Sequence, residues 1–594
     1  MPGPIRGEVE KAKNFKVAIT RMIKELKPFY IPSFFATLFA SVGSIIAIIT
    51  PNKLSELTDE ITNGLTGQMN FDAVWSIVIV VAILFVTSLV FEIIEAFLMT
   101  DVSNNFARLL RTQISEKINR LPLKFFDNHQ TGDTLSRVTN DVDSVAQSLN
   151  ESLSTLVSAV TLLVGVIIMM FVTNGVMAIT SIISGLIGFF FVFIVLKRSQ
   201  KYFTMRQKEL GNLNSHIEEI YSGLNVVRAY NGKKESDLEF DKLNKKVYDA
   251  NRKSQFLSGL MPPMMGFIGN LGYVAVCVVG AIMVMNHAIT FGSIIAFIIY
   301  VRMFTSPLSQ IAQALNYLQL SAAASERVFE FLDTEEMPDQ KDATMHLDKD
   351  KVKGKIEFKN VKFGYKKDQL IIKDFSASVK PGQKIAIVGP TGAGKTTMVN
   401  LLMKFYDINS GSISIDDVPI NKLTRENVHE LFTMVLQDTW LFSGTIKENI
   451  VYNRTHISDA RVKEVCDTIG LTHFIKTLPH GFNSEISENE SVSAGQRQLL
   501  TIARGMVEDA PFLILDEATS NVDTRTEELV QKAMDKLMQG RTSFIIAHRL
   551  STIKNADLIL VMKDGNIVES GKHKELIKKN GFYAELYNSQ FQNT

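Results

Sequence analysis

Six long apolar runs constrain the fold of this 594-residue chain more than any other feature. Each run is long enough to cross a bilayer as a helix, which takes about 20 residues. A buried helix of a soluble protein can be equally apolar, but six such runs make that alternative a weak one. We predict membrane-spanning helices at residues 30–50, 74–99, 153–172, 176–196, 261–285 and 291–309.

The connections between these runs predict their orientation. Two long polar loops follow the second and the fourth run, and both are rich in Lys and Arg, as are residues 1–27. The connections on the opposite side contain a single Lys or Arg residue, Lys53. By the positive-inside rule, we expect a multi-pass protein of the cytoplasmic (inner) membrane with both termini in the cytosol.

Composition excludes several classes of protein. The formal net charge of +1 gives no argument for nucleic-acid binding. The two cysteines, Cys277 and Cys466, cannot be a disulfide framework. The chain through Lys27 is mixed in charge and lacks a short apolar core with a cleavage site, so we expect no cleaved signal.

The long loops are predicted to be helical. No proline interrupts residues 74–121, so the second span could continue into the cytosol as one helix of about 70 Å. Short apolar and aromatic stretches at residues 123–127 and 217–223 suit docking against a soluble domain. By periodicity alone, solvated turns are an equal alternative.

The second half of the chain has a different pattern. Past residue 318 the apolar runs shorten and alternate with turns, and the charged segment 333–355, with Pro338, indicates a linker. We predict a transmembrane domain with an N-terminal elbow helix at residues 1–332. An α/β nucleotide-binding domain is expected at residues 356–594.

A phosphate-binding loop of the form G-x-x-x-x-G-K-T lies between an apolar strand-like run and a helix-compatible run. The glycines let backbone N–H groups surround phosphates, Lys395 supplies positive charge, and the Thr396 hydroxyl can ligate Mg²⁺. A chance Gly-rich turn is a poor alternative because the context also fits. The predicted ATP-contacting residues here are Gly389, Pro390, Thr391, Gly392, Ala393, Gly394, Lys395, Thr396 and Thr397.

Two carboxylates end the apolar run at residues 512–515. Asp516 is a candidate for the Mg²⁺ shell, and Glu517 is a candidate to polarise the attacking water. Paired acids after a strand can instead cap the next helix. The phosphate-binding loop upstream favours the catalytic interpretation.

With both motifs present, the chain resembles the ATP-binding cassette (ABC) family over nearly its whole length. Tyr365 is similar to the aromatic residue that stacks on adenine, and Gln437 to the Q-loop residue, which joins Thr396 and Asp516 around Mg²⁺. The resemblance further implies that Asp523 belongs to the D-loop and that His548 is the switch histidine at the γ-phosphate. Each match is weak alone; their order makes the resemblance specific.

The family signature is altered in this chain. Its usual form is Leu-Ser-Gly-Gly-Gln, whereas this chain has Val492, Ser493, Ala494, Gly495 and Gln496. The resemblance implies that two cassettes stack head to tail, so this segment caps ATP held by a partner. A methyl at Ala494 would loosen that cap, and the preceding residues 487–491 also lack the glycines expected of the X-loop.

An intact base at Glu517 beside an altered signature resembles the catalytic-glutamate-bearing subunit of bacterial heterodimeric multidrug exporters. We therefore expect a second, different half-transporter subunit with a degenerate ATP site. A homodimer that tolerates the Gly-to-Ala change is the alternative.

The cargo is the least constrained prediction. Glu92, Glu95 and Arg302 within the spans, and the prolines and methionines of residues 261–265, could line a cavity. We expect ATP-driven export of hydrophobic or amphipathic, drug-like molecules, with a homodimeric lipid flippase or peptide exporter of the same fold as the alternative. A non-transport ATPase would lack the spans, and importers usually separate the membrane part from the cassette.

Overall fold

The computed structural model describes residues 12–67, 69–366, 369–436, 439–454, 456–486, 492–516, 524–546 and 550–591. These residues form two compact units. The helical unit holds the described residues up to Leu121 and from His129 to Glu336. The sheet unit holds Pro122–Asn128 together with the described residues from Met337 onward.

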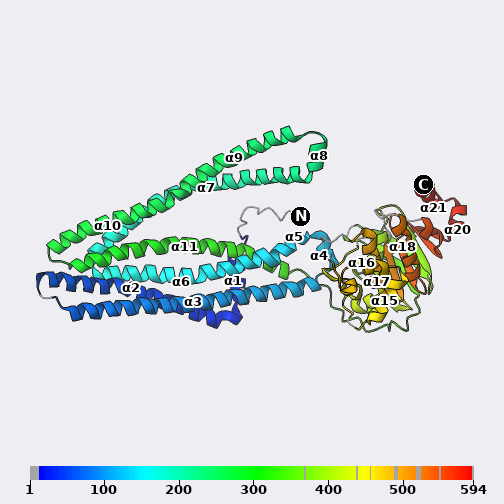
Figure 1. Ribbon diagram of the computed structural model, residues 1–594, viewed down its shortest axis with the longest axis horizontal. Coiled ribbons are helices and arrows are strands. Elements are labelled where there is room, and N and C mark those ends of the chain that lie inside the picture. Colours follow the sequence, from blue (N-terminus) through cyan, green and yellow to red (C-terminus); the bar gives the residue numbers. More distant parts are fainter. Residues whose placement is uncertain are drawn as a thin grey trace. The chain divides into compact units, whose positions relative to one another are not determined.

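Helices build the described part of the helical unit (Figure 1). Six helical stretches are long and apolar enough to cross a membrane, and each overlaps one predicted run, which confirms the prediction of six spans. A spanning segment is helical because lipid offers no hydrogen bonds to its backbone. The helices are α1 (Phe15–Glu25), α2 (Tyr30–Thr66), α3 (Phe71–Arg120), α5 (Thr131–Ser136), α6 (Val142–Thr173), α7 (Gly175–Ser222), α8 (Leu224–Ala229), α9 (Lys233–Gly259), α10 (Met261–Met285) and α11 (Phe291–Leu332).

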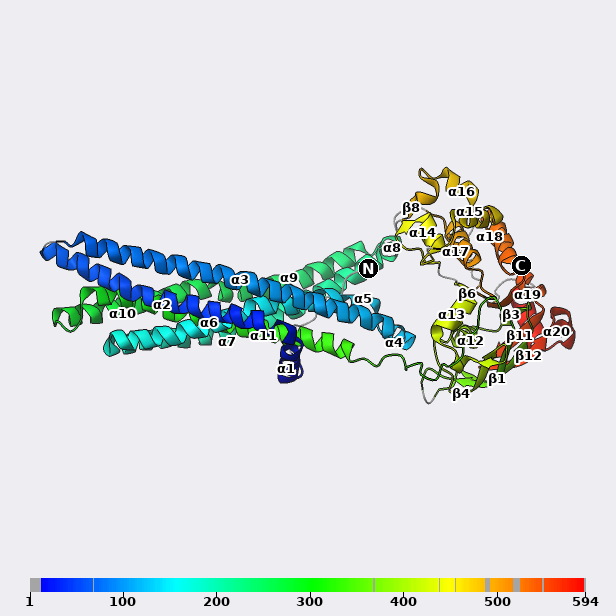
Figure 2. The same cartoon turned by 90° about the horizontal axis from the view of Figure 1, so that it is seen from below.

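Helix α3 confirms the predicted long helix (Figure 2). Its 50 residues span about 75 Å at 1.5 Å per residue, well beyond the roughly 30 Å hydrocarbon core. The side chain of Asn70 caps its start by accepting a hydrogen bond from the Ala73 N–H at 3.1 Å. Leu121 is extended because the following residue, Pro122, disfavours helical backbone before it. The helix therefore ends at the short segment that belongs to the sheet unit.

The spanning helices pack in two groups within the helical unit. Helix α11 lies along α6 and α2 along α3, whereas α7 pairs with α9 and α10 (Figure 1). Between α7, α10 and α11 the core includes the buried side chains of Met177, Val276 and Tyr300. The Tyr300 hydroxyl donates to Asn52 Oδ1 at 2.9 Å, which satisfies a polar group that lipid could not.

Glycines of α7 let this helix approach α10 and α11 closely. A Cβ added at Gly188 of α7 would lie 2.1 Å from Ile268 Cγ2 of α10. A Cβ at Gly185 would lie 2.8 Å from Phe304 Cε1 of α11. Small residues allow such approach, which supplies the packing contacts that hold helices together in lipid.

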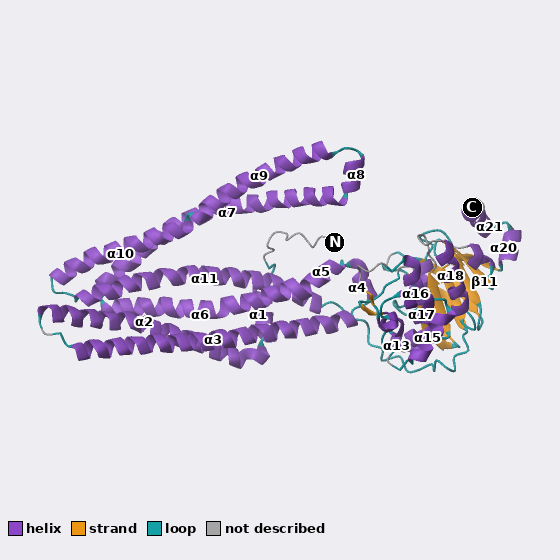
Figure 3. Ribbon diagram, viewed as in Figure 1, coloured by secondary structure: helices purple, strands orange, loops and turns teal. Residues whose placement is uncertain are grey.

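All described strands belong to the sheet unit (Figure 3). Ten of them form one sheet in the order β5-β4-β1-β2-β12-β11-β3-β10-β9-β6, and β7 and β8 form a small second sheet. The strands are β1 (Ile356–Phe363), β2 (Ile372–Val379), β3 (Lys384–Val388), β4 (Ser410–Ile415), β5 (Val418–Pro419), β6 (Phe432–Val435), β7 (Gly444–Thr445), β8 (Glu485–Ile486), β9 (Phe512–Asp516), β10 (Thr542–Ile546), β11 (Leu558–Lys563) and β12 (Asn566–Gly571).

Cores on both faces cover the central strands. Ile385 and Ile387 of β3 point into one core, whereas Ala386 and Val388 point into the other. This alternation confirms the predicted α/β domain, in which central parallel strands are buried on both sides. The helices of the sheet unit are α4 (Leu123–Asn128), α12 (Lys395–Leu402), α13 (Arg425–Leu431), α14 (Ile446–Val451), α15 (Asp459–Thr468), α16 (Thr472–Thr477), α17 (Ala494–Glu508), α18 (Thr524–Leu537), α19 (Leu550–Lys554), α20 (His573–Lys579) and α21 (Phe582–Phe591).

Candidate functional site

The predicted phosphate-binding loop joins β3 to α12, which is the strand-loop-helix arrangement that such a loop needs. Gly392 and Gly394 have φ of +84° and +98°, in the left-handed region that favours glycine. At Gly389, an added Cβ would lie 2.4 Å from the Met562 carbonyl oxygen. All three glycines are thus required by the backbone of the loop.

Lys395, the first residue of α12, reaches back over the loop. Its Nζ donates to the carbonyl oxygens of Gly389 at 2.7 Å and Pro390 at 3.1 Å. Burial lowers the pKa of the Lys395 ammonium below its ordinary value, and the charge of the Asp516 carboxylate opposes that shift. These carbonyls are neutral acceptors, so a phosphate could replace them with charge-assisted bonds.

Parallel strands bring the other predicted segments to the same edge of the sheet. Ile387 of β3 pairs with Ile546 of β10, and Ile546 pairs with Asp516 of β9. On the far side of β9, Leu515 pairs with Val435 of β6. The carboxyl ends of all four strands therefore meet where α/β proteins bind their ligands.

Four predicted site residues, Gln437, Glu517, Asp523 and His548, lie outside the described residues. In the sequence, Glu517 directly follows Asp516, His548 is two residues past the end of β10, and Gln437 is two residues past the end of β6. Their positions in the chain thus follow strands that end at the loop edge.

The predicted adenine-stacking residue lies beside the loop helix. Tyr365 is half-buried, and its hydroxyl is 3.4 Å from the Thr397 Oγ1 of α12. Its ring meets Phe363 edge-to-face with centroids 5.1 Å apart and Tyr406 with centroids 5.0 Å apart. Neighbouring rings thus fix the orientation of Tyr365.

Sequence reasoning missed Tyr406. Its hydroxyl donates to the Asp127 carboxylate of α4, and burial, aided by that hydrogen bond, raises the pKa of its phenol. The expected docking of residues 123–127 on a soluble domain therefore agrees with the structure, which places α4 in the sheet unit. The aromatic pair Phe405-Tyr406 just after the loop helix was the available signal. A cavity of about 490 Å³ lies here, lined by Lys124, Asp127, Asn128, Tyr365, Lys366 and Tyr406.

The altered signature forms the N-terminus of α17. Ser493 Oγ accepts from the Gln496 N–H at 3.2 Å, and Gln496 Oε1 accepts from the Ser493 N–H at 3.0 Å. Val492 packs against the core and Gly495 is buried, whereas Ala494 is exposed. The 15-residue helix presents its positive dipole end here, which favours a bound anion. The Ala494 methyl thus lies at the surface that an anion would approach.

The residues near the loop fit Mg²⁺ only with ligands from a nucleotide and water. Thr396 is exposed, and Asp516 lies at the end of β9. In the described part of the chain, no cluster of three or more His, Cys, Asp or Glu could hold a metal by itself. Mg²⁺ commonly takes one or two protein oxygens together with phosphates and waters, and this donor set suits that mode.

Comparison with known proteins gives matches in both halves of the chain. Residues 33–308 match the ABC transporter transmembrane region, and residues 372–520 match the ABC transporter ATPase family. A fatty acid ABC transporter ATP-binding/permease protein of Mycobacterium tuberculosis is 39% identical over 615 residues, covering 97% of each chain.

Two further relatives are similar over most of the chain. An uncharacterized ABC transporter ATP-binding protein of Bacillus subtilis is 38% identical, covering 98% of this chain and 96% of that protein. An ATP-dependent lipid A-core flippase of Syntrophus aciditrophicus is 32% identical, covering 84% of this chain and 82% of that protein. With a six-span helical region and an α/β ATPase in one polypeptide, the chain belongs to the ABC transporter family, as a half-transporter.

Proposed function

We propose that this half-transporter exports an amphipathic, lipid-like substrate across the cytoplasmic membrane. ATP-driven export follows from the family and from the fusion of spans to an ATPase. The names of full-length relatives, a fatty acid transporter and a lipid A-core flippase, carry the choice of substrate class. They favour the lipid alternative of the sequence analysis over the drug-like cargo, which rests on resemblance to multidrug exporters alone.

The proposed chemistry is hydrolysis of the γ-phosphate of ATP. Glu517 accepts a proton from water as the water oxygen bonds to the γ-phosphorus and the bond to the ADP oxygen breaks. Lys395 neutralises phosphate charge, and Tyr365 stacks on adenine. His548 contacts the γ-phosphate. The support is the common strand edge that precedes Glu517 and His548, together with the loop contacts of Lys395.

For Mg²⁺ we propose Thr396, Gln437 and Asp516 as the protein side of the site. When bound, the ion neutralises charge on the phosphate oxygens. The Thr396 hydroxyl and the Asp516 carboxylate are the hard oxygen donors that Mg²⁺ prefers. Asp516 also acts electrostatically on Lys395, whose ammonium it favours.

A half-transporter implies a dimer, and we propose a different chain as the partner. The signature at Ser493 would cap the partner's ATP, and the partner's signature would cap ATP held by Lys395. The exposed Ala494 methyl supports a weakened cap on one side only. ATPase activity of this chain purified alone tests the proposal. Full cooperative ATP hydrolysis without a second polypeptide would contradict the heterodimer.

The substrate class is tested by ATPase stimulation of the purified dimer in lipid nanodiscs. Fatty acids and lipid-like amphiphiles are compared with a panel of cationic and neutral dyes at matched concentrations. The proposal expects stimulation by amphiphiles that dyes do not reproduce. Stimulation by dyes alone would restore the drug-export alternative.

A further inference from the structure

Helix α11 has one buried face and one polar face. Buried side chains at Phe297, Tyr300, Val301 and Phe304 pack into the core of the helical unit. On the other face, side chains spaced alternately four and three residues apart are exposed in the single chain. This spacing puts them in one line along a helix. They form the α11 stripe: Arg302, Ser306, Ser309, Gln313 and Asn316.

Counted from Phe291 as the outer boundary, Arg302 lies near the middle of the membrane. It is about 16 Å along the helix axis from Phe291, where α11 begins, and the hydrocarbon core is about 30 Å thick. Ser306 and Ser309 lie deeper toward the cytosol, and Asn316 lies past the inner boundary. A polar row at this depth cannot face lipid without cost, because lipid offers no hydrogen bonds.

The charge of Arg302 is not neutralised by a carboxylate of the described residues. Its polar neighbour on α10 is Tyr273. Gly272 beside it packs closely, because an added Cβ would lie 2.9 Å from Val301 Cγ1. Arg302 is therefore held on a firmly packed helix pair while its guanidinium stays available. An intramembrane cation of this kind marks a pathway or awaits an anion.

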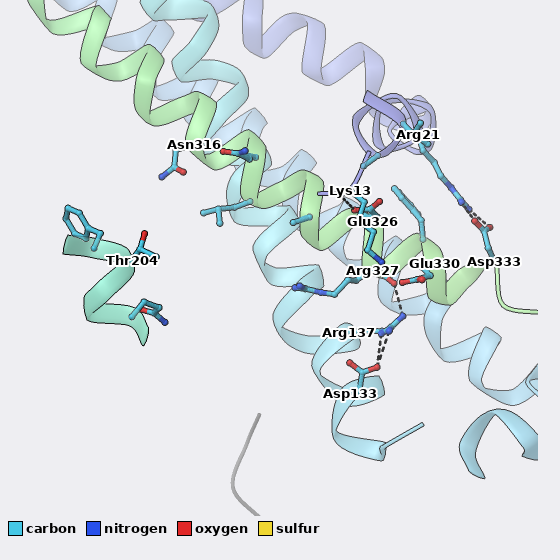
Figure 4. A pocket seen from close by; sticks show the side chains of 18 of the residues that line it. Lys13, Arg21, Asp133, Arg137, Thr204, Asn316, Glu326, Arg327, Glu330 and Asp333 are labelled. Atoms are coloured by element: carbon cyan, nitrogen blue, oxygen red, sulfur yellow. Dashed lines mark hydrogen bonds and ion pairs between the residues drawn. The ribbon is translucent and has the colours of Figure 1, made fainter. Parts of the chain in front are cut away.

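The inner end of the stripe opens into a large cavity. This cavity, of about 1690 Å³, is lined by Asn316 and Gln319 of α11 and by Gln200 and Thr204 of α7. Asn316 and Thr204 lie on opposite sides of it (Figure 4). The α11 stripe thus extends from this polar cavity to Arg302.

Three arginines of the cavity wall are paired with carboxylates, whereas Lys13, which also lines the cavity, donates to Glu326 through its backbone N–H. Arg21 bridges to Asp333, and Arg137 pairs with Asp133 at 3.1 Å, as the dashed lines in Figure 4 show. Arg327, also on the wall, bridges to Asp141. Arg21 thus joins α1 to the C-cap of α11, Arg327 of α11 is bound to Asp141 just before α6, and Arg137 donates to the Arg327 carbonyl oxygen at 3.1 Å. An anion that moved from the cavity along the α11 stripe would meet the positive charge of Arg302.

We propose that the α11 stripe lines the transport route and that Arg302 binds the anionic headgroup, a carboxylate or phosphate, of an amphipathic substrate near the membrane midplane. That the substrate is an amphiphile rests on the proposed function. That its headgroup is anionic and binds at this site is inferred from the residues of α11. The guanidinium donates paired hydrogen bonds to either anion, while the acyl chain extends toward the apolar surfaces of the spans.

Binding to the full-length dimer in nanodiscs tests the proposal. The probes share one acyl chain and differ in headgroup: oleate, oleyl phosphate, oleylamine and oleyl alcohol. Wild-type protein should bind at least one anion at least about 10-fold more tightly than the alcohol or the amine. Arg302→Gln should weaken anion binding by about 10- to 100-fold and erase this preference, and Arg302→Lys should keep most of it.

The two anionic probes and a control variant make the outcome specific. A larger loss for oleyl phosphate than for oleate assigns the site to phosphate headgroups, and the reverse assigns it to carboxylates. Arg252→Gln removes an exposed charge from α9, away from the stripe, and should leave binding unchanged.

Three results would overturn the inference. Unchanged anion preference in Arg302→Gln would show that Arg302 does not bind the headgroup. This result would not contradict the proposed transport of amphipathic molecules. Loss of the dimer in both Arg302→Gln and Arg302→Lys, seen by size-exclusion chromatography, would make the stripe a subunit interface. Failure of wild-type protein to bind any of the four probes would contradict the proposed function itself, and the inference with it.

Discussion

The phosphate-binding loop and the α11 stripe are two sites of opposite construction in one chain. The loop is eight consecutive residues whose glycines, at +84° and +98° in φ, set the backbone itself around a ligand. The stripe takes single residues at helical spacing from Arg302 to Asn316, on a helical backbone that contains Pro307. A contiguous site is thus visible in sequence, whereas a site spread over one helix face becomes visible only when burial separates that face from the others.

The two sites also differ in role, because the loop serves ATP hydrolysis and the α11 stripe is proposed to select the substrate. The loop and the strands beside it supply the reaction that the whole family shares. The stripe lies on a spanning helix, where we propose that it determines which substrate is transported. Variants at the two sites should therefore change different quantities, and the following experiments are ordered by the size of the expected effect.

Glu517→Gln should have the largest effect. Loss of the proposed base is expected to lower ATP hydrolysis by about 10²- to 10⁴-fold, with nucleotide binding retained, because Gln keeps the shape but accepts no proton. Phosphate release and binding of a labelled nucleotide measure the two quantities. Glu464→Gln, an exposed position on α15, is the matched control and should match wild type. Undiminished turnover of Glu517→Gln would refute the assignment.

Tyr365→Ala should raise the KM for ATP by about 5- to 150-fold, since stacking on a base contributes about 1–3 kcal/mol. The kcat should change less, because Tyr365 contacts the base and not the phosphates. Tyr365→Phe keeps the ring and loses only the contact with Thr397 at 3.4 Å, so its KM should stay near that of wild type. An unchanged KM in the alanine variant would remove Tyr365 from the adenine site.

Ala494→Gly should change ATP hydrolysis of the heterodimer by less than about threefold, or about 0.6 kcal/mol, because this signature caps the partner's degenerate ATP site and not the site that holds Glu517. Ala460→Gly is a matched control at an exposed position in the first turn of α15. Steady-state phosphate release measures both. A larger rise in Ala494→Gly would show that this signature caps a hydrolysing site, which favours the homodimer.

Glu92→Gln should have the smallest effect, within about twofold on transport. The Ser88 hydroxyl donates to Glu92 Oε1 at 3.4 Å and to the Gly43 carbonyl of α2 at 3.2 Å, so Glu92 belongs to the contact between α2 and α3. It lies about 32 Å along α3 from Phe71, near the inner interface rather than the midplane. Gln can still accept the hydrogen bond, with a net worth of about 1 kcal/mol. A tenfold loss of transport would instead indicate that Glu92 lines the transport route.

Sequence predicted the elements whose cause is local. The six spans follow from apolar length, and α3 follows from a stretch without proline that ends just before Pro122. The loop at Gly389 was predictable because its residues are consecutive. The strand edge that gathers the site could be expected only in outline, because the pairing of Ile546 with both Ile387 and Asp516 depends on strand order.

Residues that act through distant contacts could not be found in this way. Tyr406 meets Asp127, which is far from it in the sequence, and periodicity left the helix of Asp127 as either a docking segment or a solvated turn. Arg302 was a candidate for the cavity, as were Glu92 and Glu95. Both Arg302 and Glu92 are exposed in the single chain, and only the structure shows that Glu92 accepts a hydrogen bond from Ser88 at the contact between α2 and α3.

ATP-dependent uptake of labelled oleate into inside-out vesicles that contain the full dimer tests the central claim most directly. The account predicts accumulation that requires hydrolysable ATP, stops in Glu517→Gln vesicles and is diminished when Arg302→Gln replaces the wild-type chain. ATP hydrolysis by the same vesicles with no accumulation of oleate or any other amphiphile would contradict it.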